Sequence, residues 1–297
     1  MQRLRLGLGA VMLFVLCACG AAASPTAAPT PAAVSVQATL AASNLVVGPN
    51  RLPIGLLVDG SPINDPAAKV HLRFFYLDGT EAQKSEIAGE TDATYYGQGL
   101  PVAVYVTYPE LPAAGAWGIE VEATLPGQQP SVSRLRIDVL AEDPTPALGS
   151  QAIPVDTQTA ATNPDLATIS SDPQINPALY QISVADAIKS GKPTAILFGT
   201  PGFCKTATCG PSIKVLGELQ KQFGAQANFI HVETYQYPFS ESVQANPPRV
   251  VPFMSAWSLA SEPWLFLVGA DGTIKYKYEG GITLDELKPV MDEFVKG

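Results

Sequence analysis

The sequence has few basic residues and no cluster of them. It contains 18 lysines and arginines against 27 aspartates and glutamates, a formal net charge of −9. Proteins that bind nucleic acids or anionic membrane surfaces present clustered basic side chains to the phosphates. We therefore expect no nucleic-acid partner.

Histidine and cysteine are also scarce, which limits the chemistry open to the chain. There are two histidines, His71 and His231, and four cysteines, two of them within the first twenty residues. His71 has no second histidine, cysteine or methionine near it in sequence, so a solvated strand position is favoured over a metal ligand. We expect no bound metal and no cofactor.

Beyond its N-terminus the sequence has no apolar run of membrane-spanning length. Arg3 and Arg5 supply a short basic region, and residues 4–16 supply an apolar stretch, which is shorter than the roughly 20 apolar residues that a membrane helix needs. A short basic region followed by such a stretch is typical of an export signal. The chain is therefore expected to act outside the cytoplasm.

The residues that follow, Leu16-Cys17-Ala18-Cys19-Gly20, resemble a bacterial lipobox. The resemblance implies a signal peptide over 1–18 and lipid attachment at Cys19. Loss of Arg3 and Arg5 leaves 16 basic against 27 acidic residues, a net charge of −11. We expect a cell-envelope protein on the outer side of the cytoplasmic membrane, held by its lipid anchor alone. A plain secretory signal is the alternative.

Two stretches of biased composition divide the remaining chain. Residues 19–33 and 142–178 are rich in alanine, proline, threonine and serine, which is typical of extended linkers. Between them, residues 34–141 contain alternating stretches such as Val70-His71-Leu72-Arg73-Phe74-Phe75-Tyr76. This period of two predicts an all-β antiparallel sandwich of immunoglobulin-like size.

Three stretches of this region, 56–63, 70–72 and 114–119, resemble the FixH/YtkA-like sandwich of exported bacterial proteins. The pattern covers about a third of the chain. The resemblance implies a fold and no activity, so the expected role is a spacer or a partner-recognition module.

Residues 179–297 combine helical and strand patterns. Ser183 with Asp186 and Thr283 with Glu286 are capping pairs that predict two helix starts. The sequence further predicts a buried strand at 195–198, a helix at 211–223, a strand at 228–233 and a hairpin over 264–278. The resulting order (helix, strand, helix, strand, strand, strand, helix) predicts an α/β fold with a mixed sheet.

Cys204 and Cys209 lie between the buried strand and the helix that follows it. The run Cys209-Gly210-Pro211 places Cys209 at a helix N-terminus, where the helix dipole and free N–H groups favour a thiolate. Cys204 lies five residues upstream, close enough to close a disulfide if the loop folds back. In an oxidising compartment the pair predicts a disulfide, either redox-active or purely structural.

The order of elements, Cys209-Gly210-Pro211 at the head of a helix, and Glu262-Pro263 before the hairpin resemble the thioredoxin family, including its TlpA-type members. The resemblance implies a thioredoxin-like fold over 179–297 and thiol–disulfide exchange on exported proteins. It further implies that Pro263 is a cis-proline that binds the substrate backbone. Glu262, Gly210 and Pro211 would line the same substrate site.

Departures from the family's Trp-Cys-Gly-Pro-Cys motif leave the cysteine roles open. Aligned on Gly-Pro, Cys209 takes the first cysteine position and Ser212 the second; aligned on the preceding aromatic, Phe203-Cys204 takes the first position. An apolar residue near Leu197 replaces the usual acid. We expect Cys209 to attack and Cys204 to resolve the mixed disulfide, with the reverse order as the alternative. A non-catalytic binding protein with a structural disulfide is the second hypothesis. Copper delivery through the two cysteines and His231 is a minor third.

Overall fold

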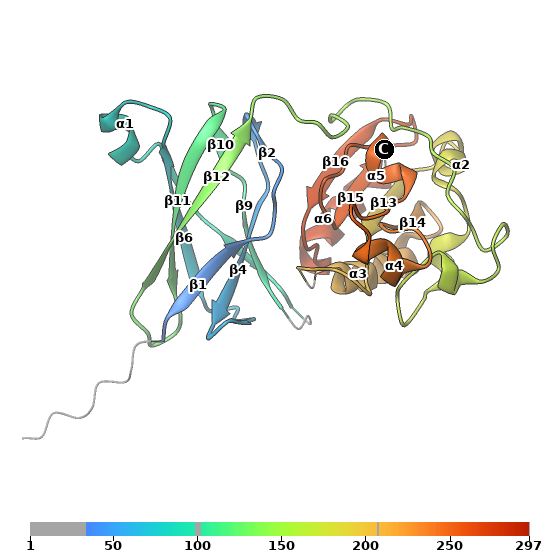
Figure 1. Ribbon diagram of the computed structural model, residues 1–297, viewed down its shortest axis with the longest axis horizontal. Coiled ribbons are helices and arrows are strands. Elements are labelled where there is room, and N and C mark those ends of the chain that lie inside the picture. The colour runs from blue at the N-terminus through green and yellow to red at the C-terminus, as the bar shows by residue number, and fades with distance from the viewer. Residues whose placement is uncertain (1–33, 99–101, 207, 297) are drawn as a thin grey trace, which may run out of the picture. The chain divides into compact units, whose positions relative to one another are not determined.

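The computed structural model describes residues 34–98, 102–206 and 208–296 (Figure 1). Contacts divide the chain into Met1–Ala33 and Val34–Gly297. The predicted signal peptide (1–18), the lipid acceptor Cys19 and the spacer 19–33 therefore lie outside the described residues. No helix in the described ranges has the length and hydropathy of a membrane span.

Residues 34–140 form two five-stranded sheets and a two-stranded ribbon (Figure 1). The first sheet contains β1 (Val36–Leu40), β4 (Leu52–Val58), β5 (Ser61–Pro62), β8 (Thr94–Tyr96) and β9 (Val104–Thr107). The second contains β2 (Leu45–Val46), β6 (Lys69–Tyr76), β7 (Gly89–Asp92), β11 (Gly115–Thr124) and β12 (Ser131–Leu140). The ribbon pairs β3 (Gly48–Pro49) with β10 (Glu110–Leu111), and α1 (Glu81–Ser85) follows β6.

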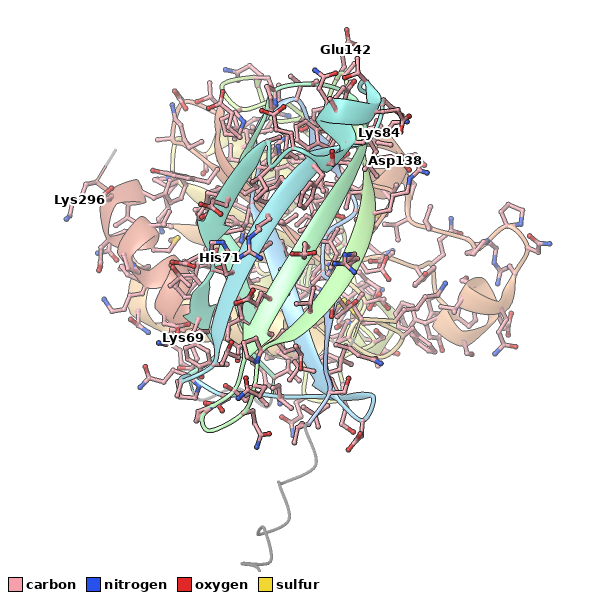
Figure 2. All side chains as sticks on the ribbon, turned by 90° about the vertical axis from the view of Figure 1, so that its left-hand side faces the viewer. Lys69, His71, Lys84, Asp138, Glu142 and Lys296 are labelled. Atoms are coloured by element: carbon pink, nitrogen blue, oxygen red, sulfur yellow. A yellow bond between two sulfur atoms is a disulfide. The ribbon has the colours of Figure 1, made fainter. Side chains whose placement is uncertain are left out.

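The alternating pattern separates a buried face from a charged face, as predicted. Trp117 of β11 and Leu52 of β4 are buried in one core that both sheets share. Figure 2 views the outer face of the second sheet, which carries His71. On this face Arg73 Nη1 lies 3.2 Å from Glu120 Oε1. The two sheets therefore bury their apolar faces against each other, and residues 34–140 are called the sandwich below.

Residues 142–296, called the C-terminal part, hold a four-stranded mixed sheet in the order β14-β13-β15-β16. β13 (Thr194–Gly199) runs parallel to β14 (Asn228–Glu233) and antiparallel to β15 (Trp264–Val268), which pairs with β16 (Ile274–Glu279). The helices are α2 (Val184–Lys189), α3 (Cys209–Phe223), α4 (Phe239–Gln244), α5 (Pro252–Ala256) and α6 (Leu284–Phe294). Two 3-10 turns precede them, η1 (Leu166–Thr168) and η2 (Pro177–Tyr180).

β13 is buried along its whole length because helices cover both faces of the sheet. Leu197 packs in a core with α3 and α6, whereas Ile196 packs in a second core with α2 and α5. Ser183 and Thr283 accept the expected capping hydrogen bonds at the starts of α2 and α6. The predicted order of helices and strands is confirmed, with two further short helices, α4 and α5, between β14 and β15.

The segment 142–178, expected to be a linker, packs on the C-terminal sheet over much of its length. The Ala152 N–H donates to the Gly272 carbonyl at 2.9 Å. The Ile153 carbonyl accepts the indole N–H of Trp257 at 3.2 Å. Composition indicates where a chain is extended, but it does not indicate whether the extended chain lies against a neighbour. The segment 142–178 does lie against the C-terminal sheet, so the folded C-terminal part begins well before residue 179.

A buried ion pair connects the sandwich to the C-terminal part. Arg51 Nε lies 2.7 Å from Glu286 Oε1, and the two side chains are 6% and 3% exposed. The same guanidinium donates to the carbonyls of Glu279 and Gly281 at 2.7 and 2.8 Å. A buried charge is tolerated when it is paired and hydrogen-bonded, and here Nε, Nη1 and Nη2 of Arg51 each donate to an acceptor.

Candidate redox site

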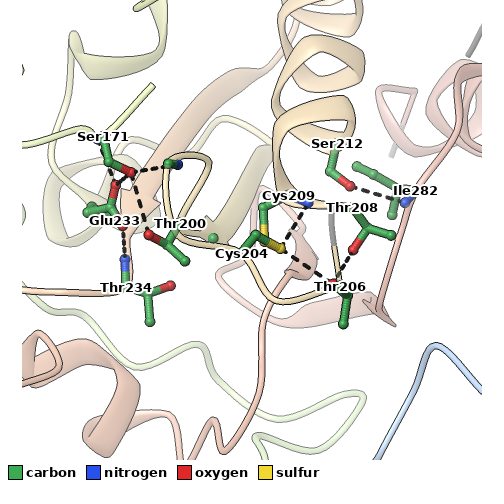
Figure 3. The surroundings of a disulfide bond; sticks show 12 residues. Ser171, Thr200, Cys204, Thr206, Thr208, Cys209, Ser212, Glu233, Thr234 and Ile282 are labelled. Atoms are coloured by element: carbon green, nitrogen blue, oxygen red, sulfur yellow. Dashed lines mark hydrogen bonds between the residues drawn. A yellow bond between two sulfur atoms is a disulfide. The ribbon is translucent and has the colours of Figure 1, made fainter. Parts of the chain in front are cut away.

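The predicted disulfide is present between Cys204 and Cys209, whose Cα atoms lie 5.9 Å apart. The loop after β13 folds back over the first turn of α3 and brings the two cysteines together (Figure 3). Cys209 is 0% exposed, whereas Cys204 is only partly buried. Cys204 is therefore the cysteine that a second molecule can reach.

The first turn of α3 contacts the sulfur of Cys204 through a hydrogen bond. The backbone N–H of Cys209, the first residue of α3, donates to Cys204 Sγ at 3.3 Å. Thr206 Oγ1 lies 3.4 Å from the same sulfur, and the Thr208 hydroxyl pairs with Thr206 instead of capping the helix. Because helix N-termini stabilise negative charge, this geometry favours a thiolate on Cys204. Cys209, the residue expected to attack, has no exposed surface in the disulfide form.

Gly199, at the end of β13, lies between Cys209 and Pro263. A methyl group in place of its hydrogen would lie 3.5 Å from Cys209 Cβ and 3.6 Å from Pro263 Cβ. The Glu262–Pro263 peptide bond is cis, and Pro263 is buried. Gly210 lies partly buried in the first turn of α3, as does the neighbouring Pro211. The structure thus brings Pro263 to the disulfide.

Glu262 is a half-buried carboxylate next to this site. Burial raises the pKa of Glu262, the nearby charge of Lys205 opposes that shift, and Glu233 reinforces it. Lys205 directly follows Cys204 and is exposed. An acidic and a basic side chain therefore lie within electrostatic range of each other beside the accessible cysteine.

A hydrogen-bonded network supports the loop that leads to Cys204. Ser171 donates from its N–H and its hydroxyl to Glu233 Oε2, at 2.8 and 2.7 Å. Its hydroxyl oxygen also accepts the Gly202 N–H at 3.0 Å. A methyl group on Gly202 would lie only 2.9 Å from the Ser171 carbonyl oxygen, so the two backbones are closely packed. Figure 3 shows this cluster beside the disulfide.

His231 is a buried neutral side chain. Its Nε2 lies 3.0 Å from the Gly199 carbonyl, which can only accept, so Nε2 carries the hydrogen and Nδ1 accepts from the Tyr180 hydroxyl at 2.6 Å. Burial lowers the pKa of His231. Both nitrogens are thus occupied, and this arrangement does not support the copper hypothesis. Among the described residues, no three histidine, cysteine or acidic side chains gather as a metal site.

Sequence reasoning missed the residues that support the loop. Glu233 ends a buried strand, and a charged residue at such a position could have indicated a functional or supporting role. Ser171 carried no signal, because it lies in a segment of biased composition and contacts Glu233 across 62 residues. Gly199, which lies between Cys209 and Pro263, was likewise missed.

Comparison with protein-family models and with curated proteins finds no match for this chain. The interpretation of the site therefore depends on its geometry. That geometry combines an accessible sulfur at a helix N-terminus, a buried partner cysteine and a proline beside them.

Proposed function

We propose that this chain is an extracytoplasmic thiol–disulfide oxidoreductase that acts on exported proteins through Cys204 and Cys209. The observation that carries the proposal is the hydrogen bond from the first N–H of α3 to the sulfur of the partly exposed Cys204. Reactive cysteines combine access with a positive local field. Cys204 combines both features, whereas Cys209 is fully buried and a substrate cannot reach it.

The proposed steps assign the attacking role to Cys204. In the reducing direction its thiolate attacks one sulfur of a substrate disulfide, and the other substrate sulfur leaves as a thiolate. Cys209 then attacks Cys204 Sγ, which closes the Cys204–Cys209 disulfide and releases the second substrate thiolate. The substrate gains two electrons and the protein dithiol loses two. Oxidation of a substrate dithiol follows the same steps in reverse, and the reduction potential sets the direction.

We further propose a thioredoxin-like fold for the C-terminal part and an immunoglobulin-like, FixH/YtkA-like fold for the sandwich. The sheet order β14-β13-β15-β16, with one parallel and two antiparallel pairings, supports the first assignment. The two sheets with one shared core support the second. The proposed location is the outer side of the cytoplasmic membrane, through lipid on Cys19, and it depends on the lipobox resemblance alone.

Trapping experiments test the assignment of the two cysteines. A Cys209→Ser variant lacks the resolving thiol, so its Cys204 thiolate should attack a labelled disulfide substrate, release one substrate sulfur as a thiolate and accumulate as the mixed disulfide. A Cys204→Ser variant is the matched control and should accumulate none, because the remaining thiol is buried. Accumulation on Cys209 instead would contradict the proposed order of attack.

The reduction potential of the pair separates exchange from a structural disulfide. Equilibration of residues 34–297 against glutathione and dithiothreitol should give a potential between about −120 and −270 mV, the range of known exchange catalysts. The rival hypothesis is a binding protein with a structural disulfide, and the full burial of Cys209 favours it. A potential below about −300 mV would support that rival and contradict the oxidoreductase proposal.

A further inference from the structure

A pocket of about 350 Å³ opens at the free edge of the C-terminal sheet. It lies between the end of β14, the segment near Asp156 and the insertion that carries α4 and α5. Its volume is at the lower end of the range for small-ligand sites. Tyr235, Tyr237, Phe239 and Glu233 also contribute to its wall. This cavity is called the edge pocket below.

The chemistry of the edge pocket suits a positive charge. Tyr235 and Phe239 are buried in its wall, whereas Tyr237 is 59% exposed. The rings of Tyr237 and Phe239 meet edge to face, with centroids 5.5 Å apart. Asp156 and Glu233 add two carboxylates, and no lysine or arginine of the described residues lines the cavity. Aromatic faces together with carboxylates attract organic cations.

The edge pocket adjoins the redox site through two of its wall residues. Glu233 binds Ser171, which in turn binds Gly202, two residues before Cys204. On the other side, burial and the nearby charge of Glu262 raise the pKa of Tyr235, and Glu262 is bonded directly to Pro263. A polypeptide that crosses Pro263 with its cysteine at Cys204 would therefore have this cavity within reach of a neighbouring side chain.

We propose that the edge pocket binds a lysine or arginine side chain of the polypeptide that exchanges disulfides with Cys204. The inference rests on the proposed function and adds a substrate class to it: exported polypeptides with a basic residue near the reacting cysteine. The acidic balance of this chain, 27 acidic against 18 basic residues, favours the approach of such a partner.

Binding of cysteine-free peptides tests the pocket independently of exchange. The probes are blocked glycine–serine peptides with serine in place of cysteine and one arginine, norleucine or glutamate placed at successive positions around it. Calorimetry should show about tenfold tighter binding of the best arginine peptide than of its norleucine counterpart. Equal binding of the three series, or a preference for norleucine or glutamate, would overturn the proposal.

Variants locate the binding and identify its source. Asp156→Asn and Tyr237→Ala should each weaken the arginine peptide about threefold or more. The control Asp138→Asn, on the outer face of the sandwich, should leave binding unchanged. Acetyl-arginine amide alone should bind far more weakly than the peptide, and equal binding would mark a free-cation site and overturn the polypeptide assignment.

The two proposals fail in distinguishable ways. If the arginine preference is present and the disulfide does not exchange, the pocket stands as a site for basic polypeptides and the oxidoreductase proposal is wrong. If exchange occurs at equal rates with arginine and glutamate peptides that carry cysteine, and the cysteine-free series shows no preference, the pocket proposal is wrong and the oxidoreductase proposal stands.

Discussion

Replacement of Ser171 by alanine tests whether the segment 142–178 is a structural part of the redox site. The Ser171 hydroxyl makes a charge-assisted hydrogen bond to Glu233 at 2.7 Å and accepts the Gly202 N–H at 3.0 Å. Ser171→Ala removes both interactions and leaves the backbone N–H of residue 171 in place on Glu233. The carboxylate therefore loses one of its three donors.

The size of the effect follows from these contacts. A hydrogen bond to a charged group contributes about 1.5–3 kcal/mol, and loss of its donor leaves a buried carboxylate less well solvated. Gly202 is exposed, so water replaces its lost partner at little cost. We expect the free energy of unfolding to fall by about 1.5–3 kcal/mol. The loop before Cys204 should also open more often, so dithiothreitol should reduce the disulfide faster.

Urea unfolding followed by tryptophan fluorescence measures the change in the free energy of unfolding. The rate of disulfide reduction by dithiothreitol measures how often the loop before Cys204 opens. Ser150→Ala is the matched control, because that hydroxyl donates only to the nearby Ala147 carbonyl in an exposed turn. The control should stay within about 0.5 kcal/mol of the parent protein. If Ser171→Ala matches this control in both assays, the segment does not support the redox loop.

Four further predictions concern charged groups and pH. Burial lowers the pKa of His231, so the stability that its neutral form contributes is present above the unfolded pKa of about 6.5. The free energy of unfolding should therefore fall by about 1 kcal/mol from pH 6.5 to 5.5, and the variant His231→Gln should lose this dependence. For His71 the hydrogen bond that its ring donates to the Asp92 carboxylate raises the pKa. The stability that the charged form of His71 contributes is lost as pH rises through its folded-state pKa. The variant His71→Gln should remove this pH dependence, which is opposite in sign to that of His231. Arg51→Met leaves the Glu286 carboxylate buried without its partner and should cost about 3–5 kcal/mol in unfolding experiments, whereas the double variant Arg51→Met/Glu286→Leu should recover more than half. Burial raises the pKa of Glu262, so Glu262→Gln should stabilise the fold at pH 7.5 and lose this advantage near pH 3.5, as thermal unfolding at the two pH values would show.

The helices and strands were predictable because their signals are local. Alternation places Trp117 on the inner face of the sandwich. Capping pairs start α2 at Ser183 and α6 at Thr283. Each signal depends on residues within a few positions of one another, and the backbone responds to it wherever the segment lies. The helices α4 and α5 were missed because they are only six and five residues long, too short to show a clear period.

By itself the sequence determined the order of elements, the alternating faces of the sandwich and the pairing of Cys204 with Cys209, all of which depend on short separations along the chain. Tertiary structure alone decided which sulfur is accessible, because burial depends on every element packed around a residue. It also decided that Ser171 reaches Glu233 across 62 residues and that Arg51 reaches Glu286 across 235. No local pattern encodes contacts of that length, since they form only when separate segments bury their surfaces against one another.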